Sequence, residues 1–274
     1  MAGKKRIYIS VDFEGAACVI GSAQPLESLG TGINTSNLLF QQAQRLVTAE
    51  ANAAVRGALA GGAGEVIIDD AHGCGHNLLY EELHPEARVL MGAPRPRRFA
   101  PIDNGFDGMM FVGYHAMSGV QDGILSHSYS SLSTHLLKLN GKPIGEIGID
   151  AGFAGEFGVP VIFVSSDEAG CAEARKFLGK DVVTVATKKG LSRNCALSLS
   201  PAKAQELIEA GAKRAVERSG SITPYRPKGP FVVDRTCKWE SQADAAATEP
   251  GAERIDAYTV RFRAKRMLDV IRFV

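Results

Sequence analysis

Short apolar segments alternate with longer segments of helical periodicity, and this alternation is the feature that most limits the folds open to the chain. The strand-like segments are residues 6–11 (RIYISV), 66–68 (VII), 109–112 (MMFV), 160–164 (PVIFV) and 182–185 (VVTV). Continuous apolar runs of this length are typical of strands that are covered on both faces. Repeated β–α–β units predict an α/β fold in three layers, with a largely parallel sheet between helices on both faces.

Helical segments separate these strands. The longest is predicted over residues 35–59, where apolar side chains recur at helical spacing at Leu38, Leu39, Ala43, Leu46 and Val47. Gly61-Gly62 ends this helix, and shorter helices are predicted over residues 150–157 and 169–178. Further along the chain, Ser200-Pro201 is an N-cap followed by proline in the first turn, which predicts a helix to about residue 218.

The composition changes near residue 190, and we place a domain boundary there. Residues 1–190 are expected to form the α/β domain, and residues 191–274 a smaller α+β domain that supports it or mediates oligomerisation. The smaller domain would contain a linker at residues 219–230, strands at 231–233 and 257–262, and a last helix at 267–271. Within the first domain, Asn140-Gly141 between residues 134–139 and 142–144 predicts a β-hairpin.

Charge and cysteine content exclude several classes of partner. Thirty-one lysines and arginines against 30 acidic residues leave a net charge of +1, so a basic surface for nucleic acid is not expected. No apolar run approaches the roughly 20 residues that span a membrane, and residues 1–12 lack the apolar region of a signal peptide. Five cysteines without CxxC spacing are typical of reduced thiols, and we expect a cytoplasmic protein.

Ionisable side chains follow several of the predicted strands. In extended chain the carboxylates of Asp12 and Glu14 point to the same side. The carboxyl ends of parallel strands meet at one sheet edge, which collects catalytic groups. The candidate metal ligands at this edge are Asp12, Glu14, His72, His115 and Glu146.

These five candidates mix nitrogen and oxygen donors, which suits zinc better than magnesium. Five ligands are more than one catalytic zinc ion needs. With one bridging carboxylate they would suit two ions about 3.5–4 Å apart. His127, which follows Leu125-Ser126, would then remain as a proton carrier.

Nine motifs in a fixed order give the chain a resemblance to a known family. They are SVDFEG (10–15), DAH (70–72), LHPEA (83–87), GYHA (113–116), LSHS (125–128), GKPIGEIG (141–148), LSRNCA (191–196), LSPAKA (199–204) and RAKRML (263–268). On these motifs the chain resembles the zinc-dependent D-aminopeptidases associated with bacterial dipeptide-transport operons.

This resemblance implies a site, a fold and an assembly. The family's metal ligands match Asp12, Glu14, His72, His115 and Glu146, with Asp12 bridging two zinc ions, and its catalytic histidine matches His127. The implied fold is an α/β domain with a smaller α+β domain, and the implied assembly is a large ring-like homo-oligomer. The implied reaction is metal-assisted hydrolysis of short peptides or amino-acid amides from a free N-terminus.

Three departures from the family pattern affect the substrate side of the site. They are the loop at residues 116–123, the Gly73-Cys74-Gly75 segment and Asp150, where asparagine is common. Such loops line the mouth of a site in this fold, so the preference for D- over L-residues stays open. No role is assigned to Cys74, His76 or Tyr114. The glycines between His72 and His76 disfavour the helix that a zinc pair at this spacing needs.

Two other function classes remain as alternatives to the peptidase. A metal-dependent phosphoesterase would also use an Asp-x-Glu pair after a first strand, although no glycine-rich phosphate loop or arginine clamp is evident. A non-catalytic small-molecule-binding module is the third possibility, which a full set of ligands disfavours.

Overall fold

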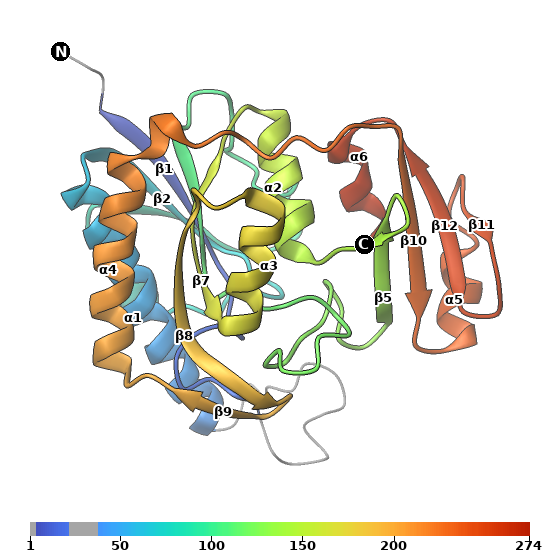
Figure 1. The fold of residues 1–274 in the computed structure, drawn as a ribbon, viewed down its shortest axis with the longest axis horizontal. Coiled ribbons are helices and arrows are strands. Elements are labelled where there is room, and N and C mark those ends of the chain that lie inside the picture. Colours follow the sequence, from blue (N-terminus) through green and yellow to red (C-terminus); the bar gives the residue numbers. More distant parts are fainter. Residues whose placement is uncertain (1–3, 22–37) are drawn as a thin grey trace.

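The computed structural model describes residues 4–21 and 38–274, and these residues form two β-sheets with helices around them (Figure 1). The first sheet has seven strands in the order β3-β2-β1-β4-β7-β8-β9. Its strands are β1 (Lys5–Val11), β2 (Ala63–Asp70), β3 (Ala87–Leu90), β4 (Gly108–Val112), β7 (Val161–Asp167), β8 (Val183–Ser192) and β9 (Cys195–Ser198). Neighbouring strands are parallel except for β9, which pairs antiparallel with β8.

Helices cover both faces of this sheet, as predicted. Figure 1 shows α1 (Leu38–Ala60) and α4 (Pro201–Glu217) on one side of the sheet, with α2 (Glu146–Glu156) and α3 (Glu168–Leu178) on the other. Side chains of alternate residues in β1 point to opposite faces of the sheet. Ile7 and Ile9 belong to the apolar core with α1 and α4, whereas Tyr8 belongs to the core with α2 and α3. The three-layer α/β fold is therefore confirmed.

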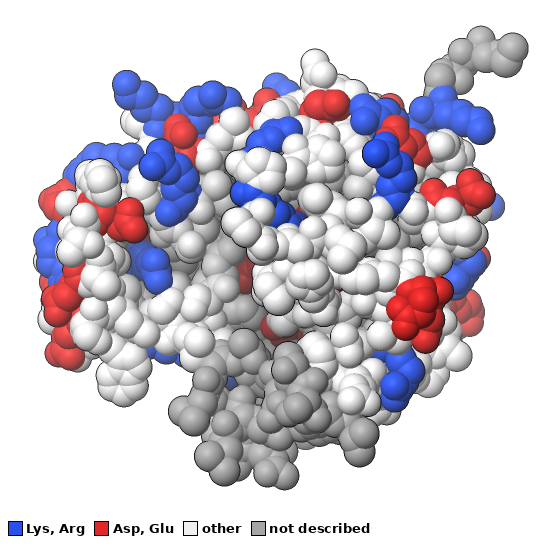
Figure 2. All heavy atoms as spheres, turned by 180° about the vertical axis from the view of Figure 1, so that it is seen from behind, with Lys and Arg blue, Asp and Glu red and all other residues white. Residues whose placement is uncertain are grey.

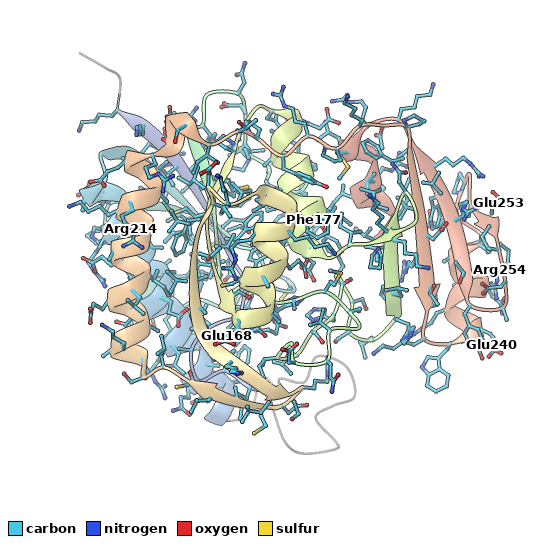
Figure 3. The ribbon with its side chains drawn as sticks, in the orientation of Figure 1. Glu168, Phe177, Arg214, Glu240, Glu253 and Arg254 are labelled. Atoms are coloured by element: carbon cyan, nitrogen blue, oxygen red, sulfur yellow. The ribbon has the colours of Figure 1, made fainter. Side chains whose placement is uncertain are left out.

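The second sheet is antiparallel and has the strand order β11-β12-β10-β5-β6. Its strands are β5 (Thr134–Leu139), β6 (Lys142–Pro143), β10 (Phe231–Cys237), β11 (Glu253–Arg254) and β12 (Thr259–Ala264). Helices α5 (Glu240–Ala246) and α6 (Met267–Val270) pack against it. Figure 3 shows Glu240, Glu253 and Arg254 at the outer edge of this part of the molecule, while Phe177 of α3 packs against its core. Short 3-10 turns occur at Tyr80–Glu82, Ser219–Ser221 and Ile271–Phe273.

The boundary between the two sheets does not coincide with residue 190. The predicted hairpin at residues 134–144 is present, but it pairs with β10 and so belongs to the second sheet. In the other direction, β9 and α4 follow residue 190 yet belong to the first sheet and its helical layer. The division into two folding units at residue 190 stays a prediction, and secondary structure elements cross it both ways.

Several element bounds differ from the sequence-based expectations. Helix α1 begins at Leu38, and the expected start at residues 35–37 lies outside the described residues. Helix α2 begins at Glu146, four residues before the predicted start, because Glu146–Gly155 are all buried and the helix has no polar face to give a periodic pattern. Strands β3 and β9 were not predicted, since both are edge strands with few buried side chains.

Surface charge is mixed, as the net charge predicts. Figure 2 shows basic and acidic side chains interspersed around the rim of one face, whose middle is largely uncharged. Within residues 4–21 and 38–274, no helix is both long enough and apolar enough to cross a membrane.

Candidate metal centre

A cavity lies beyond the carboxyl ends of β1 and β2, next to the loop that follows β4. Strands β2 and β3 lie on one side of β1, and β4 on the other, so this is the point where the strand order reverses. The cavity volume is about 240 Å³, which suits a small ligand. Five of the six predicted site residues line it: Asp12, Glu14, His72, His127 and Glu146.

The loop after β1 places Asp12 and Glu14 against the loop after β4. Asp12 N–H donates to the Val112 carbonyl at 2.8 Å, and Gly15 N–H donates to the Gly113 carbonyl at 2.8 Å. A Cβ atom at Gly15 would lie 1.8 Å from the Tyr114 carbonyl oxygen, so the two loops approach each other as closely as only glycine allows. This contact sets the position of both carboxylates relative to His115.

A buried lysine holds the same loop from the other side. Lys188 of β8 is 3% exposed, and its Nζ donates to the carbonyls of Glu14 and Ala16 at 2.6 Å each and also to that of Val19. Glu50 of α1 is also buried and accepts the Ala17 N–H at 2.8 Å. Sequence reasoning missed both residues, because their partners lie far away along the chain.

His72 is oriented by Asn77. Its Nδ1 lies 3.0 Å from the Asn77 amide oxygen, while the Asn77 amide nitrogen donates to Asp70 and to the His72 carbonyl. An amide oxygen only accepts, so Nδ1 carries the proton and Nε2 is available as a ligand. Nε2 lies 3.2 Å from Glu14 Oε1.

His115 and His127 stack with their ring centroids 4.0 Å apart. Each ring donates from Nδ1 to a backbone carbonyl at 2.9 Å, His115 to Ala116 and His127 to Leu125. Both Nε2 atoms therefore face the carboxylates. His115 Nε2 lies 3.5 Å from Asp12 Oδ2 and 3.3 Å from Glu146 Oε1, and His127 Nε2 lies 3.7 Å from the same Glu146 oxygen.

Glu146 is the first residue of α2 and is fixed by a backbone donor. Tyr129 N–H donates to Glu146 Oε1 at 2.7 Å. Asp150 lies one turn later on the same helix and accepts the hydroxyls of Tyr129 at 2.8 Å and Tyr114 at 2.9 Å. The two tyrosines thus connect the metal-ligand candidates to a second buried carboxylate.

Burial and the close carboxylates shift the pKa values of the histidines in different directions. Burial alone would lower the pKa of His72, but the negative charge of Glu14 raises it to about 10. Burial acts on His115 in the same way, and the charge of Glu146 raises its pKa well above the usual value. His127 differs, because burial and the neighbouring His115 lower its pKa.

The carboxylates show the complementary pattern. Burial would raise the pKa of Glu146, but the charge of His115 lowers it to about 2. Burial would likewise raise the pKa of Glu14, and the charge of His72 lowers it well below the usual range. Burial and the charge of Glu14 together raise the pKa of Asp12. Three carboxylates at such close range need positive charge between them.

The donor set fits a transition-metal ion. Asp12, Glu14 and His115 present ligand atoms within 4.8 Å of one another, and so do His115, His127 and Glu146. His115 Nε2 and Glu14 Oε2 are buried, and neither atom makes a hydrogen bond within the described part of the chain. Buried polar atoms without partners are rare in proteins, and a bound cation would satisfy both.

The structure therefore brings all six predicted site residues together, while their individual roles stay predictions. Cys74 is exposed, and no hydrogen bond from His76 to the six residues is found in the described chain. Tyr114 is 1% exposed and donates to Asp150, so both belong to the layer behind the site. Asn77 follows His72 of the DAH motif by five residues, and this spacing alone did not select it as a site residue.

Comparisons with known proteins give matches over nearly the whole chain. The family model described as D-aminopeptidase matches residues 5–274. A D-aminopeptidase of Bacillus subtilis (strain 168) is 33% identical over 266 residues, which are 96% of this chain and 93% of that protein. The solved structure of the Zn-dependent D-aminopeptidase DppA from Bacillus subtilis, described as a self-compartmentalizing protease, is 30% identical. It superposes with a TM-score of 0.88 over 98% of this chain and 94% of that one. The chain belongs to the D-aminopeptidase family of metal-dependent peptidases.

Proposed function

We propose that the chain is a zinc-dependent aminopeptidase that removes a D-amino acid from the free N-terminus of short peptides or amino-acid amides. The observation that carries the proposal is the pair of overlapping ligand sets, which share His115 and include three carboxylates. Two zinc ions would be held by Asp12, Glu14, His72, His115 and Glu146, with Asp12 bridging. The names of the similar proteins support zinc and the D-configuration.

In amide hydrolysis, the residues around the cavity would have two roles, which are metal binding and proton transfer. Two zinc ions, when bound, would polarise the scissile carbonyl and lower the pKa of a water molecule toward 7. His127 Nδ1 is held by the Leu125 carbonyl, so Nε2 can take a proton from the attacking water and pass it to the leaving amine. Its lowered pKa keeps the ring neutral, as a general base requires, at neutral pH.

A substrate panel and a metal analysis test this function together. D- and L-aminoacyl amides, dipeptides and an aryl phosphate should be assayed with and without chelator. We expect chelator-sensitive hydrolysis of the D-aminoacyl substrates and two zinc ions per chain. Phosphate release, or preference for L-substrates, would contradict the proposal, and zinc far below two ions per chain would favour a binding module.

Asp12→Ala tests the bridging role. Loss of a ligand shared by two ions weakens both sites, so the variant should lose both ions together. Retention of one tightly bound ion would show that Asp12 holds a single metal.

The proposal includes a homo-oligomeric assembly, which could be as large as a ring. It also includes a cytoplasmic location. The similar Bacillus structure is described as self-compartmentalizing. Trp239 and Tyr258 are 65% and 41% exposed on the second sheet and its connections, where a subunit contact would bury them. All five cysteines are free thiols, as a reducing compartment favours. Sedimentation of the zinc-loaded protein would measure the assembly, and a monomer would contradict it.

A further inference from the structure

Arg235 lies on the apolar face of the second sheet. Residues two apart in a strand point to the same side, so Arg235 of β10 shares its face with Val233 and Cys237. Its partners on the neighbouring strands are Leu137 of β5 and Val260 of β12. These four residues are at most 2% exposed and belong to the core of the second sheet. An arginine here places a positive charge where the sheet otherwise buries apolar side chains.

This half-buried arginine has no carboxylate to offset its charge. Its Nη2 donates to Ser133 Oγ at 3.0 Å, while its buried Nε has no hydrogen-bond partner and its guanidinium no ion pair within residues 4–21 and 38–274. By contrast Arg261, on the opposite face of the same sheet, donates to the two oxygens of Asp234 at 2.6 and 2.9 Å. A partly buried charge without a partner is costly, so we expect Arg235 to receive an anion from outside the chain.

A cavity of about 320 Å³ lies beside this arginine, and we call it the Arg235 cavity. Arg272 and Glu249 also line it; both are exposed, and neither forms an ion pair in the described part of the chain. Phe262 and Phe273 give the lining an apolar part, with their rings stacked at a centroid distance of 4.5 Å. Two cations, one carboxylate and an apolar surface thus surround a volume that suits a small ligand.

We propose that the Arg235 cavity binds a free α-amino acid with an apolar side chain. Its carboxylate pairs with Arg235, its ammonium group faces Glu249, and its side chain packs against Phe262 and Phe273. An inorganic anion would use the first of these contacts alone and would be repelled by Glu249. The Arg235 cavity shares no lining residue with the cavity of the metal centre, so this site goes beyond the proposed function.

Tryptophan fluorescence can report on this site, because the one tryptophan of the chain, Trp239, directly precedes α5, and residues of α5 line the Arg235 cavity. We would titrate the zinc-loaded protein with D-leucine, with isocaproate, which lacks the amino group, and with isoamylamine, which lacks the carboxylate. D-Leucine should give a saturable signal, and isoamylamine should bind about 10- to 100-fold more weakly, the range for hydrogen bonds to a charged group. Isocaproate should lose less, since Glu249 is exposed.

Three variants assign the contacts. Arg235→Met should weaken D-leucine binding by about 10- to 100-fold. Methionine suits an apolar sheet face, so without ligand this variant should unfold at no lower temperature than wild type. Glu249→Gln should weaken the binding of D-leucine but not that of isocaproate. Arg263→Met is the matched control, since this side chain is 60% exposed and outside the Arg235 cavity, and it should bind D-leucine like wild type.

Calorimetry on the same proteins decides between the alternatives. Equal D-leucine affinity of wild type and Arg235→Met, or no binding to either, would overturn the inference, and so would inorganic phosphate binding as tightly as D-leucine. D-Leucine held at the metal centre binds both proteins, so only the part lost in Arg235→Met belongs to the Arg235 cavity. Failure to hydrolyse peptides would instead contradict the proposed function and would leave this binding measurement unaffected.

Discussion

Each histidine of the site is fixed through one ring nitrogen and presents the other to the carboxylates. His72 is held by Asn77, and His115 and His127 are held by backbone carbonyls. Such outer contacts set the tautomer and the direction of the ring before any ion binds. The three rings differ in their charge preference, since the pKa of His127 is lowered while those of His72 and His115 are raised.

Replacing His127 with alanine should separate catalysis from metal binding. We expect His127→Ala to keep the wild-type zinc content and to lose about 10²- to 10⁴-fold in kcat, the usual contribution of a general acid–base group. Zinc content by elemental analysis and turnover of a D-aminoacyl amide would be measured on the same preparation. His76→Ala, in the loop after β2, is the matched control and should change neither.

The opposite outcome is also informative, because His127 Nε2 lies within ligand range of His115 and Glu146. A stoichiometric loss of zinc in His127→Ala would make His127 a ligand and would leave the proton carrier unassigned.

The sequence predicted the ligand candidates because each follows a strand that is recognisable from its own residues. It could not predict the residues that hold them. Lys188 reaches the loop after β1 across more than 160 residues of chain, and Glu50 reaches the same loop across 33 residues. Both depend on contacts that exist only in the folded molecule.

At the scale of elements, the site depends on the contact between the loops after β1 and β4. Gly15 is where these loops touch, and its N–H bonds to the Gly113 carbonyl. The candidate ligands on the two loops, Glu14 and His115, can approach each other only while this contact is kept.

Gly15→Ala should therefore weaken metal binding. The added Cβ would lie 1.8 Å from a backbone oxygen, so one loop must move. We expect about 10- to 100-fold lower zinc affinity, the range seen when groups behind a metal site are disturbed. Competition with a chromogenic chelator would measure it. Gly220→Ala, where an added Cβ meets no atom within 4 Å, should retain wild-type affinity.

Helices with one buried face and strands in the middle of the sheet were predicted from the sequence. The start of α2 and the edge strands β3 and β9 were not. The start of α2 was placed four residues late because its buried surface extends all round the helix. With that predicted start Glu146 precedes the helix, whereas in the structure it begins the helix, one turn before Asp150.

At the scale of the whole molecule, folding buries charged groups away from the metal site itself. Burial raises the pKa of Glu50 to about 7 from an ordinary 4.5. Between these pH values the folded state keeps a proton that the unfolded chain releases. The free energy of unfolding should therefore fall as the pH rises through this window, and the contribution of Glu50 is lost above pH 7.

Glu50→Gln should flatten this pH dependence. Relative to wild type, the variant should gain up to about 3 kcal/mol between pH 4.5 and pH 8, since a pKa difference converts to free energy at about 1.4 kcal/mol for each tenfold step. Urea unfolding at several pH values would measure the difference. Glu209→Gln removes a carboxylate that is 44% exposed and should follow the wild-type curve; an identical curve for Glu50→Gln would refute the effect.

The sequence predicted the layers of the molecule but not how the chain passes between its sheets. A boundary at residue 190 follows the change in composition, whereas strand β5 of the hairpin pairs with β10, about 100 residues later. Pairing across such a distance leaves no mark on local periodicity, because both partners alternate like any half-buried strand.

The return of the chain to the second sheet affects the cavity directly. Residues 129–132 line the cavity, and the backbone that follows is held by the second sheet: Lys238 N–H donates to the Ser133 carbonyl at 3.0 Å, and Gln242 donates to the Leu132 carbonyl at 3.3 Å. The second sheet, together with α5, thus supports one wall of the cavity. Removing the second sheet, or exchanging it in a chimera, would leave the candidate ligands in place but would disturb this wall of the cavity. The two sheets therefore have to be kept together in any engineered variant.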